Sequence, residues 1–169
     1  MPEAQDTSLP DSVQRVATLL REKAHPHAPV MLNDAARTAQ QAADALGIGV
    51  GQIAKSIIFR RKVDDRAVLV VTSGDLRVDE RKVAALVGQG MGLGRADADF
   101  VRQATGFAIG GVAPVAHTQP CVTLIDEQLF RFPEIWAAAG HPHGVFRLTP
   151  QDLVALTGAP VADVTQATV

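Results

Sequence analysis

The spacing of apolar residues along the chain predicts several helices. Val13, Val16, Leu19 and Leu20 recur every three or four positions, which is the period of one helix face, so we predict a helix over residues 11–24. Capping residues and terminal glycines point to further helices in the same way. These cover residues 34–46, 80–87, 97–104, 133–139 and 150–156. In the segment 133–139, Pro133 suits the first helical turn and Gly140 would end the helix.

Strands are predicted where apolar residues alternate with others or form short runs bounded by polar turns. Such segments cover residues 30–32, 50–59, 67–72, 121–126, 144–149 and 161–164. The polar residues 60–66 read as a hairpin loop between two of these strands. Helices and strands follow one another irregularly, without a repeat or a linker. We therefore predict a single α/β (α+β) domain in which helices pack on a mixed sheet, and not a doubly wound parallel sheet.

A lysine interrupts the strand VGQIAKSIIF, residues 50–59. Because side chains alternate between the faces of a strand, Lys55 shares its face with Ile53, Ile57 and Phe59. One interpretation is that its aliphatic stem covers apolar surface while the ammonium reaches water. The other is that Lys55 lies in an apolar cleft and meets a phosphate, a carboxylate or a polarised carbonyl. A buried ammonium without such a partner would be costly.

Composition narrows the range of functions. The chain has 169 residues, enough for one domain with a real core, and a formal net charge of −2. That charge argues against wrapping double-stranded DNA, but it allows a small contact with one end of an RNA. Cys121 is the only cysteine, so no internal disulfide can form and the cytoplasm is the expected location. Residues 1–9 are predicted to be a disordered lead-in, and no apolar run is long enough to suggest a membrane span.

Two loops and a charged run carry further candidate chemistry. Residues 106–114 hold three glycines and end in Pro114; they form either a plain turn or a row of backbone amides that binds a carbonyl oxygen. The run 60–62, of two arginines and a lysine, is most simply a solvated hairpin tip that could attract a polyanion. The histidines do not predict a metal site, because no acidic residue stands at a typical ligand spacing. They are His25, His27, His117, His141 and His143.

Five segments in order resemble the YbaK/prolyl-tRNA-editing family. They are QIAKSIIF, VVTSGDLRVDERKVAALVG, ATGFAIGGVAPVAH, the aspartate of LIDEQL and IWAAAGHPHGVFRLTPQDL. The resemblance extends from about residue 10 to residue 164 and implies that residues 10–169 form a YbaK-like domain with a curved, largely antiparallel sheet. Members of this family hydrolyse the ester that links a wrong amino acid to tRNA, chiefly tRNA for proline. The implied partners are the acceptor end of a mischarged tRNA and prolyl-tRNA synthetase, and no cofactor or metal is implied.

The resemblance also implies roles for individual residues. Lys55 matches the essential lysine of the family, and Gly110 and Gly111 belong to its G-x-x-x-P loop, so these three are the candidate catalytic residues. The candidate substrate-binding residues are Ile53, Ser56, Pro114, His117, Gly140 and His141. The nucleophile is expected to be a positioned water or the ribose 2′-OH.

The identity of the edited amino acid stays open in the sequence. Ala138 and Val145 are apolar where cysteine-selective members carry polar groups, which favours alanine or another small amino acid. Cysteine on tRNA for proline is the alternative substrate. A module that binds an RNA end or another anion without catalysis is the alternative of a different class.

Overall fold

The computed structural model describes residues 9–33 and 38–167, and the predicted lead-in over residues 1–9 lies almost wholly outside this range. The α-helices are α1 (Asp11–Glu22), α2 (Ala39–Leu46), α3 (Glu80–Val87), α4 (Ala98–Thr105) and α5 (Pro150–Thr157), and the short 3-10 helices are η1 (Val50–Gln52) and η2 (Glu127–Arg131). The strands are β1 (Val30–Met31), β2 (Ile53–Arg61), β3 (Ala67–Ser73), β4 (Leu93–Arg95), β5 (Val122–Asp126), β6 (Ile135–Ala138), β7 (Gly144–Leu148) and β8 (Val161–Ala162). None of the helices in these ranges combines the length and apolar character that a membrane crossing requires.

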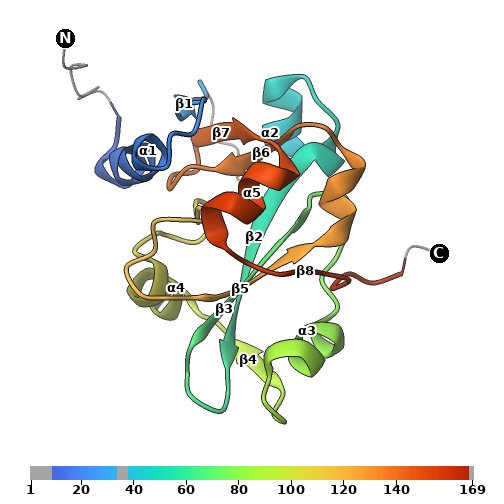
Figure 1. Cartoon of the computed structure of the whole chain (residues 1–169). Coiled ribbons are helices and arrows are strands. Elements are labelled where there is room, and N and C mark those ends of the chain that lie inside the picture. The colour runs from blue at the N-terminus through green and yellow to red at the C-terminus, as the bar shows by residue number, and fades with distance from the viewer. Residues whose placement is uncertain (1–8, 34–37, 168–169) are drawn as a thin grey trace.

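One mixed sheet organises the described part of the chain, in the order β1-β7-β6-β2-β3-β5-β8, with β4 added to β2 (Figure 1). Four of its pairings are antiparallel and three are parallel. The predicted hairpin is confirmed: β2 and β3 pair from Ala54 opposite Ser73 to Arg60 opposite Ala67. Parallel neighbours on both sides of this hairpin give the single mixed α+β domain that the sequence predicts.

The helix predicted over residues 133–139 is wrong, because this segment contains the strand β6. β6 pairs with β2 on one side and with β7 on the other. Its side chains alternate: Ile135 and Ala137 are buried, whereas Trp136 and Ala138 are partly exposed. The helix propensity of the alanines is outweighed by the burial and ladder hydrogen bonds of an interior strand.

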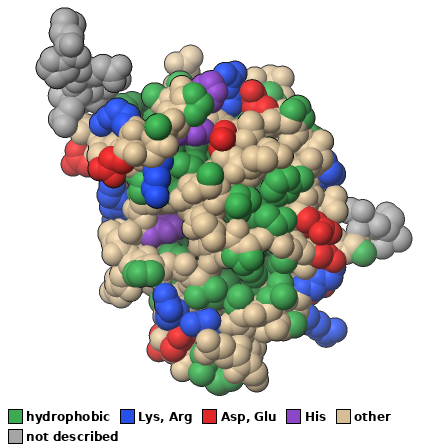
Figure 2. Space-filling model, in the orientation of Figure 1, with side chains coloured by type: hydrophobic (Ala, Val, Ile, Leu, Met, Phe, Trp, Pro, Cys, Tyr) green, Lys and Arg blue, Asp and Glu red, His purple; other side chains and the backbone are tan. Residues whose placement is uncertain are grey.

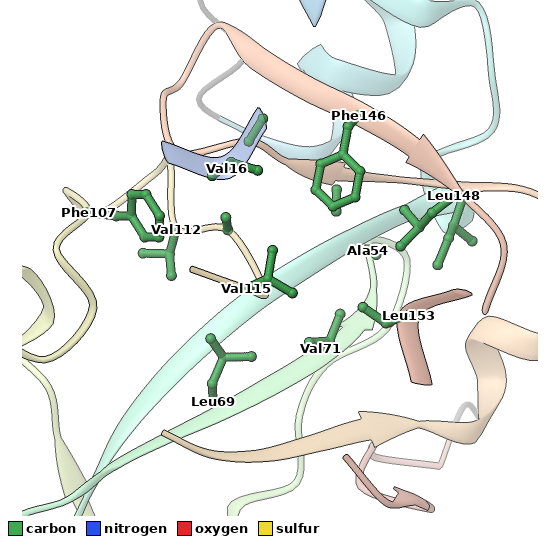
Figure 3. Packing of buried hydrophobic residues seen from close by; sticks show 14 of the residues in the cluster. Val16, Ala54, Leu69, Val71, Phe107, Val112, Val115, Phe146, Leu148 and Leu153 are labelled. Carbon is green, nitrogen blue, oxygen red and sulfur yellow. The ribbon is translucent and has the colours of Figure 1, made fainter. Parts of the chain in front are cut away.

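The sheet is covered on both faces. Ala54, Leu69 and Val71 point into the main core, where they meet α1, α5 and the loop that carries Phe107 and Val112 (Figure 3). Residues of the opposite parity belong to two smaller clusters on the other face. In one cluster, Val83 of α3 packs on Phe59, Val68, Val70, Leu124 and Val164. In the other, Ala42 and Ala43 of α2 pack on Ile53. Lys55 lies on this second face, between Ile53 of one small cluster and Ile57 beside the other.

The charged hairpin tip is more structured than the sequence suggests. Arg61 is buried, and its guanidinium donates to both carboxylate oxygens of Asp64 at 3.0 and 2.8 Å and to the carbonyl of Val87 at 3.1 Å. The expectation of a fully solvated run is therefore wrong for Arg61, which ties the hairpin to the end of α3. On the face shown in Figure 2, charges of both signs form small separate groups, so no broad basic surface is present there.

Candidate active site

A cavity lies where the pairing of β2 with β6 ends. The two strands pair through only Ile53 with Trp136 and Ala54 with Ala137. Beyond Ala54, the stretch from Lys55 to Ile58 pairs with β3 alone, so one edge of β2 is free until β4 joins at Phe59. We call the space beside this edge the inner cavity; its volume is about 300 Å³. Its lining is mostly small and apolar, from α2, β6, β7 and a loop: Ala39, Ala42, Ala137, Ala138, Val145 and Val112.

Lys55 stands at the rim of the inner cavity as a cation without an internal partner. Its side chain is half-buried and lines the cavity together with Ile53 and Ser56. It forms no hydrogen bond or ion pair with any residue in the described ranges. Burial lowers the pKa of Lys55, nearby Arg77 lowers it further, and Asp75 partly opposes this. A cation held in this way is suited to an anion that arrives with a ligand.

The glycine loop lies on the opposite wall. Gly110 has φ of +93°, a left-handed conformation that glycine adopts without strain. The N–H of Gly111 donates to the carbonyl of Ala108 at 3.1 Å, so this amide is already occupied within the loop. The N–H groups of Gly110 and Val112, both of which line the cavity, have no partner among the described residues. The available donors are therefore those of Gly110 and Val112, and not the Gly111 amide that the sequence suggested.

His141 closes another side of the cavity in a defined tautomer. The backbone N–H of His143 donates to Nδ1 of His141 at 3.0 Å. In the neutral ring the proton must therefore be on Nε2, which makes that nitrogen a hydrogen-bond donor. His143 in turn is held to Leu32 by two bonds, of 3.2 Å from its ring to the carbonyl and 2.7 Å from the Leu32 N–H.

The predicted site residues divide into two groups. Lys55, Ile53, Ser56, Gly110 and His141 come together at the inner cavity. The remaining four do not line it: Gly111, Gly140, Pro114 and His117.

Gly111 and Gly140 are tightly packed in the loops beside the cavity, whereas Pro114 and His117 lie apart from it. Gly111 is packed so tightly against His141 that an added Cβ would lie 2.8 Å from the His141 Cα. Gly140 takes φ of +96° beside Phe107. Pro114 and His117 line a separate hollow, where the His117 ring bonds to the carbonyl of Ala113 at 2.7 Å. Burial lowers the pKa of His117.

Several lining residues were not predicted from the sequence. Ala39 and Ala42 come from an alanine-rich helix, where nothing distinguishes a cavity wall from ordinary packing. Ala137 was assigned to a helix, whereas it lies in β6 and pairs with Ala54 of β2. Among the residues that the structure describes, no three His, Cys, Asp or Glu side chains are grouped closely enough to hold a metal ion. Burial raises the pKa of the Cys121 thiol to about 11, which keeps it protonated and unreactive.

Ser56 lines the cavity, and its hydroxyl is buried without a hydrogen-bond partner in the described structure. An unsatisfied buried hydroxyl costs about 1–3 kcal/mol. We expect Ser56→Ala to raise the free energy of unfolding by about 1 kcal/mol and, if a bound ligand satisfies the hydroxyl, to weaken ligand binding. Chemical denaturation and ligand titration of the same variant measure the two effects; a loss of stability would mean that the hydroxyl has a partner in the folded protein.

Within the described residues, the fold therefore brings together a small apolar cavity, a cation without an internal partner on its rim and backbone amides without a partner on its wall. The sequence profile of the aminoacyl-tRNA editing domain family matches residues 33–156. The chain therefore belongs to this family.

Individual relatives agree with this membership. The Bacillus subtilis protein YwhH, itself uncharacterised, is 32% identical over 116 residues, which cover 69% of this chain and 72% of YwhH. The crystal structure of a putative trans-editing enzyme for prolyl-tRNA synthetase is 44% identical in sequence to this chain. It superposes with a TM-score of 0.87 and covers 94% of this chain and 99% of that one. Hypothetical protein APE2540 is 28% identical with a TM-score of 0.82, covering 90% and 99% of the two chains. The fold and the editing domain inferred from the sequence are thus confirmed.

Proposed function

We propose that the protein is a trans-editing deacylase that hydrolyses the ester of tRNA(Pro) mischarged with alanine or another small amino acid. Its partners are then the acceptor end of that tRNA and, for recruitment, prolyl-tRNA synthetase, and its place of action is the cytoplasm. Membership of the editing-domain family and the similarity to the putative trans-editing enzyme for prolyl-tRNA synthetase support this proposal. The observation that carries it is the inner cavity, which is small, apolar and bordered by Lys55.

The cavity suits the aminoacyl group. Apolar side chains form most of its walls, and the alanines and valines among them leave space for a small aminoacyl side chain. The free edge of β2 beside Lys55 leaves backbone groups available to the amino group and the carbonyl of the substrate. Ser56 adds a hydroxyl that is not satisfied inside the protein.

The reaction requires little from side chains because an aminoacyl ester is already activated. A water, which the neighbouring ribose 2′-OH can help to position, attacks the carbonyl carbon, and the carbonyl oxygen becomes an oxyanion. The bond to the ribose 3′ oxygen then breaks, this oxygen takes up the proton that the water loses, and the free amino acid and the 3′-OH of the tRNA are released. The N–H groups of Gly110 and Val112 donate to the oxyanion. Lys55 neutralises negative charge near the ester or the adjoining phosphate. Ser56 is not the nucleophile, because its oxygen contacts no base that would activate it.

Filling the cavity tests the proposal. Ala138 is a partly exposed lining residue on β6, where a β-branched side chain is well tolerated. We expect Ala138→Val to lower kcat/KM for alanyl-tRNA(Pro) by about tenfold, because its two added methyl groups occupy the space of the substrate side chain. The measurement is release of amino acid from a panel of tRNAs charged with alanine, cysteine, serine and proline.

The same panel separates the alternatives. Wild-type activity on the cysteine substrate alone would overturn the preference for alanine. Saturable tRNA binding without deacylation of any substrate would contradict the enzyme and favour a binding module.

A further inference from the structure

A second hollow adjoins the inner cavity on the far side of Lys55. We call it the outer hollow; its volume is about 730 Å³ and it is the more open of the two. It lies between β2, α3 and the turn before α3, and its lining includes Lys55, Ile57, Phe59, Arg77, Val78 and Arg81. Lys55 and Ile57 line both spaces. A ligand could therefore extend from one space into the other past the Lys55 ammonium.

The outer hollow collects cations that the protein itself does not neutralise. Arg77 and Arg81 are exposed, and neither guanidinium has a hydrogen bond or an ion pair among the described residues. Five cations elsewhere in the described residues do lie 2.8–3.4 Å from a carboxylate: Arg60, Arg61, Lys82, Arg131 and Arg147.

The position of these arginines is unfavourable without a ligand. Arg77 is near enough to Lys55 to disfavour its charged form. Arg81 stands in the first turn of α3, where the helix dipole disfavours a positive charge. Asp79 and Glu80 also line the hollow, so three cations face two carboxylates there. The Asp79 carboxylate accepts from the N–H of Arg81 at 3.0 Å as the cap of α3, and among the described residues neither acid forms an ion pair with these cations. Three cations that converge without internal partners favour a bound polyanion.

The floor of the outer hollow is apolar and fixed in place. Ile57 and Val78 provide a partly exposed aliphatic surface, with the buried ring of Phe59 behind it, that a nucleobase can contact. Val78 is held by a β-bridge to Thr165, and the N–H of Gln166 donates to the carbonyl of Arg77 at 2.8 Å. An apolar floor with a rim of arginines matches a nucleotide better than it matches a simple anion.

We infer that the outer hollow binds the single-stranded nucleotides that precede the terminal adenosine of the tRNA, with Arg77 and Arg81 on their phosphates. The aminoacyl group then occupies the inner cavity, and the ester lies between the two spaces beside Lys55. This inference rests on the proposed function. It assigns binding of the RNA backbone to residues that take no part in the chemistry.

The experiment compares two substrates of different length with the variant R77A/R81A. One substrate is alanyl-tRNA(Pro), and the other is 3′-O-alanyl-adenosine, which lacks the preceding nucleotides. We expect KM for the tRNA to rise at least about tenfold with kcat within twofold of wild type, because charge-assisted hydrogen bonds from arginine to phosphate are about twice as strong as neutral ones. Both parameters for alanyl-adenosine should stay unchanged. The slope of log KM against log salt for the tRNA should fall by about 0.7 for each phosphate that the variant no longer neutralises.

A matched variant and a binding measurement make the outcome decisive. R21A/R102A removes two other exposed arginines, on α1 and α4, which lie apart from α3 in Figure 1, and it should leave KM unchanged. Unchanged KM in R77A/R81A, or an equal loss on both substrates, overturns the inference while deacylation by wild type stands. If wild type does not deacylate, the proposed function fails. The inference is then judged by the Kd for an RNA oligonucleotide ending in CCA, which R77A/R81A should raise and R21A/R102A should not.

Discussion

Replacing Lys55 with methionine is expected to abolish deacylation while making the folded domain more stable. Methionine keeps the aliphatic length but removes a charge that is half-buried without a partner. We expect kcat/KM to fall at least about a hundredfold, because the anion that Lys55 neutralises is left uncompensated. The free energy of unfolding should rise by about 1 kcal/mol, as is common when a strained active-site charge is removed. Deacylation of alanyl-tRNA and chemical denaturation measure the two quantities.

The pH dependence of the wild-type protein follows from the lowered pKa of Lys55. The pKa of this lysine is lower in the folded chain than in the unfolded chain, so between the two values the unfolded chain binds more protons. Stability from this group therefore increases as pH rises through that interval and is lowest below it. Deacylation activity should instead fall as the pH rises through the lowered pKa of Lys55, because the cation is lost at a lower pH than in an ordinary lysine. The variant Lys55→Met should lack both effects.

Lys62→Met is the matched control, since Lys62 is an exposed lysine at the hairpin tip. It should leave activity and stability within error of wild type. Wild-type deacylation by Lys55→Met, with the fold intact, would remove Lys55 from the chemistry. A large loss of stability would show instead that Lys55 has a favourable partner in the folded state.

Local signals in the sequence were sufficient for most elements. The hairpin of β2 and β3, the cap of Asp79 on α3 and the Thr149–Pro150 start of α5 all depend on neighbouring residues, and the structure contains each of them. β6 depends instead on contacts with strands far away in the sequence. Its alanines favour a helix locally, and only pairing with β2 and β7 makes them a strand.

The candidate site likewise combines features that follow from neighbouring residues with features that follow from contacts in three dimensions. The alternation of side chains along the strand was enough to place Lys55 on the same face as Ile53 and Ile57, and in the structure all three line the inner cavity. No local pattern could show that the Gly111 amide is used within its own loop, because this follows from the three-dimensional turn with Ala108. Arg77 and Arg81 were hidden for a similar reason, since their significance comes from sharing a hollow with Lys55.

Replacing Gly111 with alanine is expected to disrupt the wall of the inner cavity. A Cβ at this position would lie 2.8 Å from Cα and 2.9 Å from both N and C of His141. These are backbone atoms, so the loop carrying His141 must move instead of a side chain rotating away. We expect a loss of about 1–3 kcal/mol in stability. A fall of about a hundredfold in kcat/KM should accompany it, because a shift of about 1 Å in a positioning loop is enough for that effect.

Gly49→Ala is the control for Gly111→Ala, because its Cβ would meet only the Gln52 Oε1, at an ordinary 3.8 Å. Gly49 has φ of −73°, so alanine fits there without backbone strain and activity should be unchanged. Thermal denaturation measures stability, and deacylation of alanyl-tRNA and of alanyl-adenosine measures the site. Both substrates should be affected equally by Gly111→Ala, since the damage lies at the aminoacyl group. Full activity of Gly111→Ala would mean that the loops at 110–112 and 141–143 can separate without harm, and the tight backbone contact would then have no part in holding the substrate.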